Sequence, residues 1–351
     1  MKIFITGAAG FIGFSLVDRI LNEKNSEVVG LDVINDYYDI NIKYSRLSIH
    51  GINGSVMKNR DLQYSVNYSN YKFLKADLAD HDFIVNFIIS EKFDYVINLA
   101  AQAGVRFSID NPRMYLHSNV NGFLSVLEGC RHAKVKHLVY ASTSSVYGLN
   151  TEMPLSENQN TDHPISFYSA TKKSNELMAH TYSHLFEVPT TGLRFFTVYG
   201  PWGRPDMALF LFTNSIINNM PINVYNHGRM IRDFTFVKDI VESIFKILPN
   251  SPVKNPNWSS IKNEPFSSSA PYRIFNIGNN NPVKLMDYIN TLEICLDKKA
   301  KINFLDMQPG DVKMTNADSS RLYEVINFKP STSIKDGIEY FVKWYKEYYK
   351  I

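Results

Sequence analysis

The sequence predicts an α/β protein built on a doubly wound parallel sheet. Short runs rich in β-branched and aromatic residues recur along the chain, and segments of helix length separate them. These runs are continuous apolar stretches rather than alternating ones. Continuous apolar strands with helices between them are typical of a parallel sheet that is covered on both faces.

The predicted elements follow one another in a regular order. The predicted strands are Lys2–Thr6, Glu27–Val33, Tyr71–Ala76, Tyr95–Ala100, His137–Ala141 and Thr190–Phe196. An insertion at about 35–70, rich in Tyr, Asn and Ser, is predicted to be partly helical. Residues 250–271, rich in Pro, Ser and Asn, are predicted to form an unusually long loop. The aromatic residues between Tyr340 and Tyr349 have helical spacing, so we expect a terminal helix that packs on the body, with a membrane-surface helix as the alternative.

Composition excludes several classes of protein. The chain has 351 residues, of which 44% are hydrophobic and 20% are charged, which is ordinary for one large or two smaller globular domains. A net charge of +3 gives no reason to expect nucleic acid or a membrane as partner. No apolar run approaches the roughly 20 residues of a membrane span. Cys130 and Cys295 lie far apart and in no C-x-x-C motif, so we expect no disulfide framework and a cytoplasmic location.

The motif TGAAGFIG places three glycines directly after the first strand and at the start of a helix. Gly7, Gly10 and Gly13 permit a tight turn and close approach of the backbone to a pyrophosphate, which the helix N-terminus then faces together with Phe11 and Ile12. The spacing is G-x-x-G-x-x-G. A plain tight turn remains the alternative, and a Rossmann-type dinucleotide site is the functional interpretation.

Asp32 favours the dinucleotide interpretation. It ends the second strand nineteen residues after Gly13, where an acid can bind both ribose hydroxyls and repel a 2′-phosphate, so NAD is expected rather than NADP. Asp77 and Leu78 end the third strand, where the adenine would lie. Ala100, in the motif NLAAQAG, ends the fourth strand beside the bound cofactor.

Tyr168 and Lys172, in the motif YSATK, lie four residues apart and therefore on one face of a helix. A free tyrosine has a pKa near 10, and bringing it to about 7 requires roughly 4 kcal/mol of stabilisation of the phenolate. The Lys172 ammonium and a positive nicotinamide ring could supply this together. By itself the spacing is common and also occurs in surface pairs.

These motifs together resemble the extended short-chain dehydrogenase/reductase family, and in particular the nucleotide-sugar epimerases and dehydratases. The resemblance runs nearly end to end and includes NLAAQAGVR, SSVYG, YSATK, RFFTVYGPWGRPDM and RDFTFVKDI. It implies that Thr143, twenty-five residues before Tyr168, bridges the tyrosine and the substrate oxygen. Catalysis is therefore assigned to Thr143, Tyr168 and Lys172, with Tyr168 and Lys172 also touching NAD.

The hydroxyls of YASTSSVYG predict the substrate class. Dehydratases of the family carry an Asp-Glu pair after the bridging hydroxyl, and this chain has Ser144 and Ser145 there. Neutral donors joined by an arginine suit a sugar carboxylate, and Arg204, with Thr197 upstream, is available in RFFTVYGPWGRPDM. The alternative is that Ser144 and Ser145 only satisfy backbone groups at the end of the strand. The resemblance is greatest to UDP-glucuronate 4-epimerases, whose 4-keto intermediate would be a β-keto acid. Fixed donors would keep that carboxylate from aligning for loss of CO₂, while Ser142 is expected to be structural.

The resemblance also assigns the nucleotide end and the overall organisation. Arg232 resembles the arginine that pairs with the diphosphate, with Arg106 assisting, Tyr225 against the uracil and Asp311 on the ribose. It implies an NAD-binding domain at 1–196 with a returning segment at about 233–280, and a smaller C-terminal α/β domain for the UDP-sugar at 197–232 and 281–351. It implies a homodimer through the helix around Val120–Arg131 and the helix that carries Tyr168.

Three other functions remain open from the sequence. They are a 4-epimerase of neutral UDP-sugars, a UDP-glucuronate decarboxylase, and a non-catalytic NAD sensor. No metal is expected, because His180 and His184 lack an evident third ligand and the proposed reaction needs none.

Overall fold

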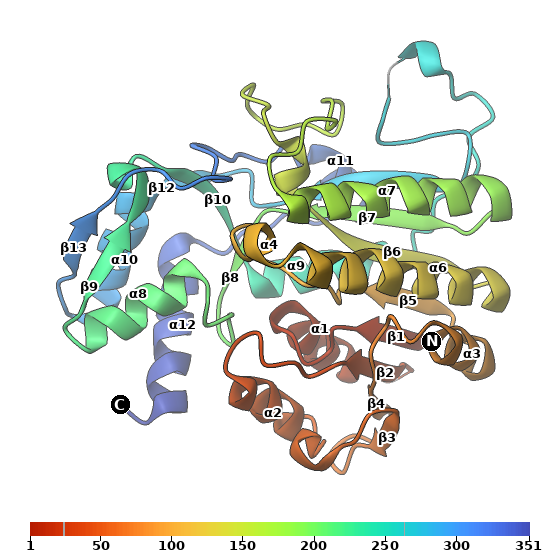
Figure 1. Cartoon of the computed structure of the whole chain (residues 1–351), viewed down its shortest axis with the longest axis horizontal. Coiled ribbons are helices and arrows are strands. Elements are labelled where there is room, and N and C mark those ends of the chain that lie inside the picture. The colour runs from red at the N-terminus through yellow and green to blue at the C-terminus, as the bar shows by residue number, and fades with distance from the viewer. Residues whose placement is uncertain (24, 263) are drawn as a thin grey trace.

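The computed structural model describes residues 1–23, 25–262 and 264–351, and its main feature is an eight-stranded sheet (Figure 1). The strand order is β11-β7-β6-β5-β1-β2-β4-β3, parallel throughout except for β3, which runs antiparallel to β4. The strands are β1 (Lys2–Thr6), β2 (Glu27–Asp32), β3 (Asp61–Tyr64), β4 (Tyr71–Lys75), β5 (Tyr95–Asn98), β6 (His137–Thr143), β7 (Thr190–Phe195) and β11 (Tyr272–Ile277). The predicted strands are confirmed, with ends that differ by one or two residues.

The sheet is buried on both faces, which explains why its strands are continuously apolar. Ile3 and Ile5 of β1 pack into one core cluster, whereas Phe4 between them packs into the other. Side chains alternate across a strand, so both halves of each alternation must be apolar when helices cover both faces.

Helices from distant parts of the chain cover the two faces (Figure 1). The apolar stripes of α1 (Phe11–Leu21) and α9 (Val237–Ile247) pack into the first core cluster, as does α11 (Ser320–Ile326). The second core cluster is formed with α3 (His81–Glu91), α6 (Gly122–Ala133) and α7 (Phe167–Phe186). Doubly wound packing of this kind leaves the carboxyl ends of the strands open at one edge.

Two insertions were predicted, and the structure contains both. The first contains α2 (Ile40–Ile49) and η1 (Gly54–Val56), as expected for a partly helical segment, but it also adds the edge strand β3, which the sequence did not predict. The second, 250–271, is a long loop with one short helical turn, η5 (Ser260–Lys262); its residue 263 lies outside the described residues.

The C-terminal part of the chain forms a second, smaller layer beside the open edge of the sheet, at the left in Figure 1. Its strands are β8 (Thr197–Tyr199), β10 (Ile231–Phe236) and β12 (Pro282–Lys284) in one sheet, and β9 (Pro221–Val224) and β13 (Lys301–Phe304) in another. Its helices are α8 (Ala208–Ile217), α10 (Leu285–Leu296) and α12 (Ile334–Tyr349). These elements share a third core cluster rich in aromatic residues.

The terminal helix packs as predicted. Phe341, Trp344 and Tyr345 of α12 are buried in the third core cluster, while Tyr340 is 57% exposed. The Trp344 ring lies 5.1 Å from that of Trp202, centroid to centroid. Within the described ranges, no helix combines the length and apolarity needed to cross a membrane.

The remaining elements are short helical segments. They are α4 (Phe107–Asp110), α5 (Pro112–Tyr115), η2 (Leu116–Asn121), η3 (Ser144–Tyr147) and η4 (Tyr225–Gly228). The segment predicted to return to the first domain places α9 and β11 in the layers of the large sheet, whereas β10 belongs to the small sheet.

Candidate active site

A cleft of about 1110 Å³ lies between the carboxyl ends of the large sheet and the smaller layer. Every residue predicted for catalysis, cofactor binding or substrate binding lines it. These residues are Gly7, Gly10, Phe11, Ile12, Gly13, Asp32, Asp77, Leu78, Ala100, Arg106, Thr143, Ser144, Ser145, Tyr168, Lys172, Thr197, Arg204, Tyr225, Arg232 and Asp311. Open α/β sheets bind ligands at this edge, so the fold itself favours the location.

The glycine turn is built as the motif predicts. Gly7 has φ +73°, and its carbonyl accepts a hydrogen bond from the Gly10 N–H at 2.9 Å. A Cβ on Gly13 would lie 2.1 Å from the Gly7 oxygen, and one on Gly7 would lie 2.8 Å from the Ala100 nitrogen. Gly10 supplies no side-chain cap to α1, so its first N–H groups face the cleft as an anion site. The cradle therefore fits a pyrophosphate.

Asp32 both supports this turn and faces the cleft. Its carboxylate accepts hydrogen bonds from the Ala9 N–H at 3.2 Å and the Ile34 N–H at 2.8 Å. The Lys43 ammonium lies 4.0 Å from the same carboxylate and donates to the backbone and side-chain oxygens of Asn35. Lys43 is buried and lines the cleft. It was not predicted from the sequence, because the composition of the insertion does not indicate which lysine lies near Asp32.

The ends of β4 and β5 form the next wall of the cleft. The Asp77 carboxylate accepts a hydrogen bond from the Ala79 N–H at 2.9 Å and lies 2.9 Å from His117 Nε2. Leu78 is buried in the second core cluster. An apolar side chain beside a fixed carboxylate is suited to the edge of a purine.

Tyr168 and Lys172 lie in the first turns of α7. Ser166 begins this helix with a capping box. Its hydroxyl accepts a hydrogen bond from the Ser169 N–H, and the Ser169 hydroxyl accepts one from the Ser166 N–H. The Lys172 ammonium donates to the Ala141 carbonyl at 2.9 Å and is almost completely buried. Burial lowers the Lys172 pKa to about 8, and Glu176, one turn further along α7, opposes that shift.

The protein alone does not make Tyr168 a base at neutral pH. Burial raises the Tyr168 pKa above its ordinary value, while the Thr143 hydroxyl and the Arg204 charge act to lower it. A further positive charge is needed before the phenolate forms readily. The nicotinamide ring was expected from the sequence to supply this charge.

All four hydroxyl residues line the cleft, but only Ser142 is bonded to a buried carboxylate behind it. Ser142 is buried and donates to Glu176 Oε1 at 2.6 Å, as its predicted structural role requires. Thr143 ends β6, and its hydroxyl donates to the Ser145 hydroxyl and accepts from the Ser145 N–H, both at 3.2 Å. Ser144 and Ser145 open the helical turn η3 and line the cleft.

Arg204 is already paired with a carboxylate of the chain. Its guanidinium donates to both oxygens of Asp206, through Nε at 3.0 Å and through a terminal nitrogen. The Tyr37 hydroxyl, across the cleft, donates to the same carboxylate at 3.2 Å, and burial together with Asp206 raises the Tyr37 pKa to about 12. Asp206 was missed, although the motif GRPDM contains it, because sequence does not reveal which carboxylate an arginine meets.

The four residues predicted for the nucleotide end also gather together. Arg106 donates to Asp311 at 2.8 Å, and its guanidinium lies 4.6 Å from the centre of the Tyr225 ring. Arg232 donates to backbone carbonyls, including that of Val312 at 2.7 Å. Burial lowers the Arg232 pKa, Asp311 acts against this shift, and Arg106 adds to it. Two cationic groups thus converge where a diphosphate is expected.

Known proteins resemble this chain in sequence and structure along nearly its whole length. Residues 3–278 match the profile of the NAD dependent epimerase/dehydratase family. The chain is 51% identical to Protein CapI of Staphylococcus aureus, with both chains fully covered. It is 43% identical to the probable UDP-glucuronate 4-epimerase of Rhizobium meliloti (strain 1021), covering 100% of this chain and 98% of that one. The crystal structure of the Bacillus cereus UDP-glucuronic acid 4-epimerase, in complex with UDP-glucuronic acid and NAD, superimposes with a TM-score of 0.84 at 30% identity, covering 99% of this chain and 100% of that one.

Proposed function

Because the chain belongs to the NAD dependent epimerase/dehydratase family, we propose that it inverts C4 of UDP-glucuronate to give UDP-galacturonate, with NAD as its cofactor. The observation that carries this proposal is the cluster of neutral hydroxyls beside the Tyr168–Lys172 pair. Thr143, Ser144 and Ser145 line the cleft with Arg204, where a dehydratase of the family would need acids. Hydroxyls and a guanidinium are suited to a C6 carboxylate.

NAD fits the residues of the first half of the cleft. A side chain at Gly7 or Gly13 would meet backbone atoms of the protein itself, so these positions require glycine, and the bare turn can approach a pyrophosphate closely. Asp32 lies where both hydroxyls of the adenosine ribose can donate to its carboxylate. Bound NAD supplies the hydride acceptor and then the hydride donor of the reaction. Since it returns to its starting state in every turnover, it has no reason to leave.

The chemistry of this chain's own residues is the movement of one proton. Tyr168, with Thr143 as the bridge, removes the proton of the 4-hydroxyl as hydride leaves C4, and a 4-keto sugar forms. The Lys172 ammonium, held by the Ala141 carbonyl, favours the phenolate by its charge. After the sugar turns in the cleft, Tyr168 returns the proton when hydride adds to the opposite face.

The carboxylate of the substrate must be restrained during this reaction. A C4 ketone with a carboxylate on C5 is a β-keto acid, which loses CO₂ when the carboxylate stands perpendicular to the carbonyl plane. We assign Ser144, Ser145, Thr197 and Arg204, together with Thr143, to holding the carboxylate away from that alignment. Because Arg204 is held by Asp206, an acidic sugar must share or displace Asp206, whereas a neutral sugar need not.

The UDP moiety is assigned to the other end of the cleft. Arg106, Arg232, Tyr225 and Asp311 all line the cleft. We assign Arg232 and Arg106 to neutralising the diphosphate, Tyr225 to stacking on the uracil, and Asp311 to accepting from the ribose. This assignment keeps the domain division proposed from sequence, with 1–196 and the returning segment at about 233–280 for NAD, and 197–232 and 281–351 for the UDP-sugar.

Incubation of the purified protein with UDP-glucuronate, followed by chromatography of the products and measurement of CO₂, tests the proposal. We expect UDP-galacturonate at equilibrium with its substrate and little CO₂. A UDP-pentose with stoichiometric CO₂ would identify a decarboxylase. Turnover confined to UDP-glucose or UDP-N-acetylglucosamine would identify an epimerase of neutral sugars, and either result would overturn the proposal.

We further propose that the enzyme is a cytoplasmic homodimer. Exposed apolar side chains lie on the two helices assigned to the interface: Leu124 on α6, and Leu177 and Leu185 on α7, of which Leu177 is 59% exposed. Apolar faces of this kind favour association across a two-fold axis. Light scattering at micromolar concentration should give twice the mass of the chain. A monomer mass that persists at that concentration would contradict it.

A further inference from the structure

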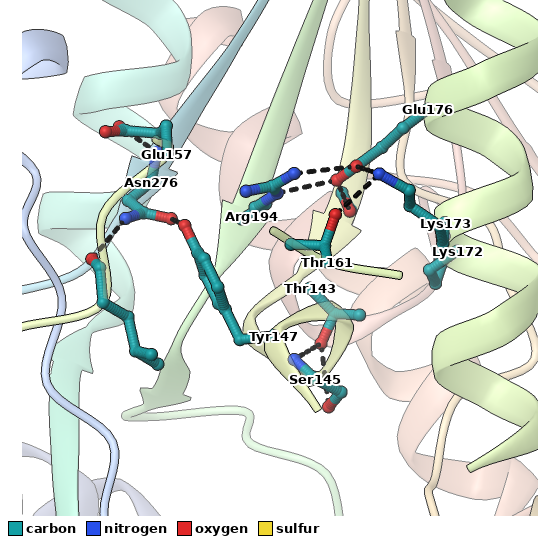
Figure 2. Close-up of polar contacts among 12 residues, drawn as sticks. Thr143, Ser145, Tyr147, Glu157, Thr161, Lys172, Lys173, Glu176, Arg194 and Asn276 are labelled. Carbon is teal, nitrogen blue, oxygen red and sulfur yellow. Dashed lines mark hydrogen bonds and ion pairs between the residues drawn. The ribbon is translucent and has the colours of Figure 1, made fainter. Parts of the chain in front are cut away.

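Behind the Tyr168–Lys172 pair lies a buried ion pair that the mechanism above does not use. Glu176 of α7 and Arg194 of β7 are 1% and 2% exposed and form two hydrogen bonds, Arg194 Nε to Oε1 at 2.8 Å and a terminal nitrogen to Oε2 at 2.9 Å. Figure 2 shows Glu176 between Arg194 and Lys173. Burial raises the Glu176 pKa, but Arg194 and the Ser142 hydroxyl outweigh it, so the net shift is downward and the carboxylate is charged.

Glu176 also reaches the strand end that carries the bridging threonine. Ser142, the residue before Thr143, donates to Glu176 Oε1 at 2.6 Å. Lys172 donates to the carbonyl of Ala141, the residue before Ser142. Two adjacent residues of β6 are therefore bonded to two residues one turn apart on α7, and Arg194 fixes the second of them from β7.

We propose that Glu176 is a positioning residue of this active site, which fixes α7 against the end of β6 and keeps the Lys172 ammonium protonated. The first action sets the separation of the Tyr168 and Thr143 hydroxyls. Thr143 directly follows Ser142, which bonds to Glu176, and Tyr168 lies one turn of α7 before Lys172, which bonds to Ala141. The second action follows from charge. Lys172 lies one helical turn from Glu176 on the same face, in surroundings that otherwise disfavour a cation.

The groups that face this ion pair come from every element packed on it. The Lys173 ammonium of α7 lies 3.9 Å from Glu176 and donates to Thr161. Tyr147 of η3 lies against the guanidinium of Arg194, 4.9 Å from ring centre to carbon. Tyr140 of β6 and Tyr272 of β11 are buried tyrosines whose pKa values are raised, first by burial and then by neighbouring charge that includes Glu176. Glu176 therefore has three cations nearby, Lys172, Lys173 and Arg194, of which Lys173 also lies 3.9 Å from Asp162.

The variant Glu176→Gln/Arg194→Met tests the charge separately from the geometry. Glutamine keeps an oxygen that accepts from Ser142, and removal of Arg194 avoids an unpaired buried cation. This proposal rests on the proposed function only for the assay of turnover. The ionisation of Lys172 can be measured on the protein without substrate.

The substrate-free measurement is the pH dependence of stability, compared with and without Lys172→Met. The Lys172 pKa is about 8 in the folded protein and 10.5 for an unperturbed lysine, so the unfolded state binds more protons between these values. The unfolding free energy then rises with pH, beginning near the folded pKa, and Lys172→Met removes this rise. In the Glu176→Gln/Arg194→Met background, we expect the onset of the rise to move about one pH unit lower, because the opposite charge of Glu176 is removed and Arg194 is not among the charges that shift the Lys172 pKa.

The kinetic readout should change together with the onset. For UDP-glucuronate we expect kcat to fall by about twofold at pH 7 and about fivefold at pH 8, with KM unchanged, because a pKa lowered by about one unit from about 8 reduces the protonated fraction of Lys172 by these factors. Glu293→Gln is the control and should leave kcat unchanged, because it disrupts only the pair between Glu293 of α10 and Lys299, neither of which lines the cleft. An unshifted onset and wild-type kcat in the double variant would overturn the proposal.

Ser142→Ala covers the case in which the double variant does not fold. It keeps every charge and removes only the bond between β6 and Glu176. We expect a lower kcat with unchanged KM and an unshifted onset of the Lys172 rise, whereas wild-type kcat would refute the positioning role. If the onset moves in the double variant but the wild type fails to epimerise UDP-glucuronate, the substrate assignment fails and this inference stands.

Discussion

The cofactor half of the cleft is the side proposed to bind NAD, and the substrate half is the side proposed to bind the UDP-sugar. Different kinds of contact stabilise these two halves. In the cofactor half, backbone and buried groups set the geometry, such as the Gly7 turn and the Lys172 bond to the Ala141 carbonyl. In the substrate half, charged side chains pair with one another, and the Arg106–Asp311 pair has an arginine that is 47% exposed. The geometry of the cofactor half therefore depends on the backbone and on buried bonds. In the substrate half, arginines pair with carboxylates of the chain, which have the same chemistry as the anionic groups of the expected ligand.

This contrast has an energetic consequence. Backbone turns and buried bonds cannot be rearranged without loss of several contacts at once. Partly exposed ion pairs contribute little to stability and exchange partners easily. Substitutions in the cofactor half should therefore cause large losses of activity, stability or NAD binding, and those in the substrate half should cause smaller, graded losses.

Tyr168→Phe should show the largest effect, on the fixed side of the comparison. Only the phenolic oxygen is lost, so kcat should fall by about 100- to 10,000-fold, the usual contribution of a positioned base, while NAD and UDP still bind. Initial rates with UDP-glucuronate and calorimetric titration with UDP measure the two quantities. If the variant keeps more than about a tenth of the wild-type rate, Tyr168 is not the base.

Gly13→Ala should break the fixed half without touching the chemistry. Its Cβ would lie 2.1 Å from the Gly7 oxygen, a backbone atom that cannot move away cheaply. We expect a loss of about 3 kcal/mol in unfolding free energy, as for severe overpacking, and loss of the NAD that co-purifies with wild type. NAD released on denaturation is the measurement, and Ser15→Ala, in the same helix, serves as the control. Full NAD content in Gly13→Ala would show that the turn can open.

Arg204→Ala should give a graded and ligand-selective effect in the substrate half. Binding of UDP-glucuronate should weaken by about 1.5–3 kcal/mol, the range for a hydrogen bond to a charged group, and CO₂ released per epimerisation should rise. Activity toward UDP-galactose-type sugars should fall less.

Asp206→Asn is the opposite test at the same place. It removes the internal carboxylate from Arg204 and Tyr37, so UDP-glucuronate should bind at least as tightly as in wild type. Equal losses on acidic and neutral sugars in Arg204→Ala, without added CO₂, would show that Arg204 is structural.

Arg106→Ala should have the smallest effect. Its ion pair with Asp311 is partly exposed, so the change in unfolding free energy should stay below about 1 kcal/mol. Affinity for UDP should fall modestly and should depend on salt, because screening weakens exposed pairs. A loss of stability comparable to that of Gly13→Ala would contradict the division of the cleft into a fixed and an adaptable half.

Six of the eight strands of the large sheet, the glycine turn and the Tyr168–Lys172 spacing were predicted from the sequence, whereas the edge strands β3 and β11 were not. Strands such as Lys2–Thr6 are identified by a continuous apolar run, the turn at Gly7 by residues that tolerate its backbone, and the Tyr168–Lys172 pair by helical periodicity. Each of these is a local property, in which the residues that interact are neighbours in the chain, so a window of a few residues contains the whole signal.

The pairing of charged groups became known only from the tertiary structure. Glu176 bonds to Ser142 and Arg194, which lie 34 and 18 residues away, and Asp206, beside Arg204 in sequence, is also reached by Tyr37 from 169 residues away. Lys43 approaches Asp32 because an insertion folds back over the cleft. An ionic partner is chosen by distance and burial in space, and neither quantity is contained in the local pattern of the chain.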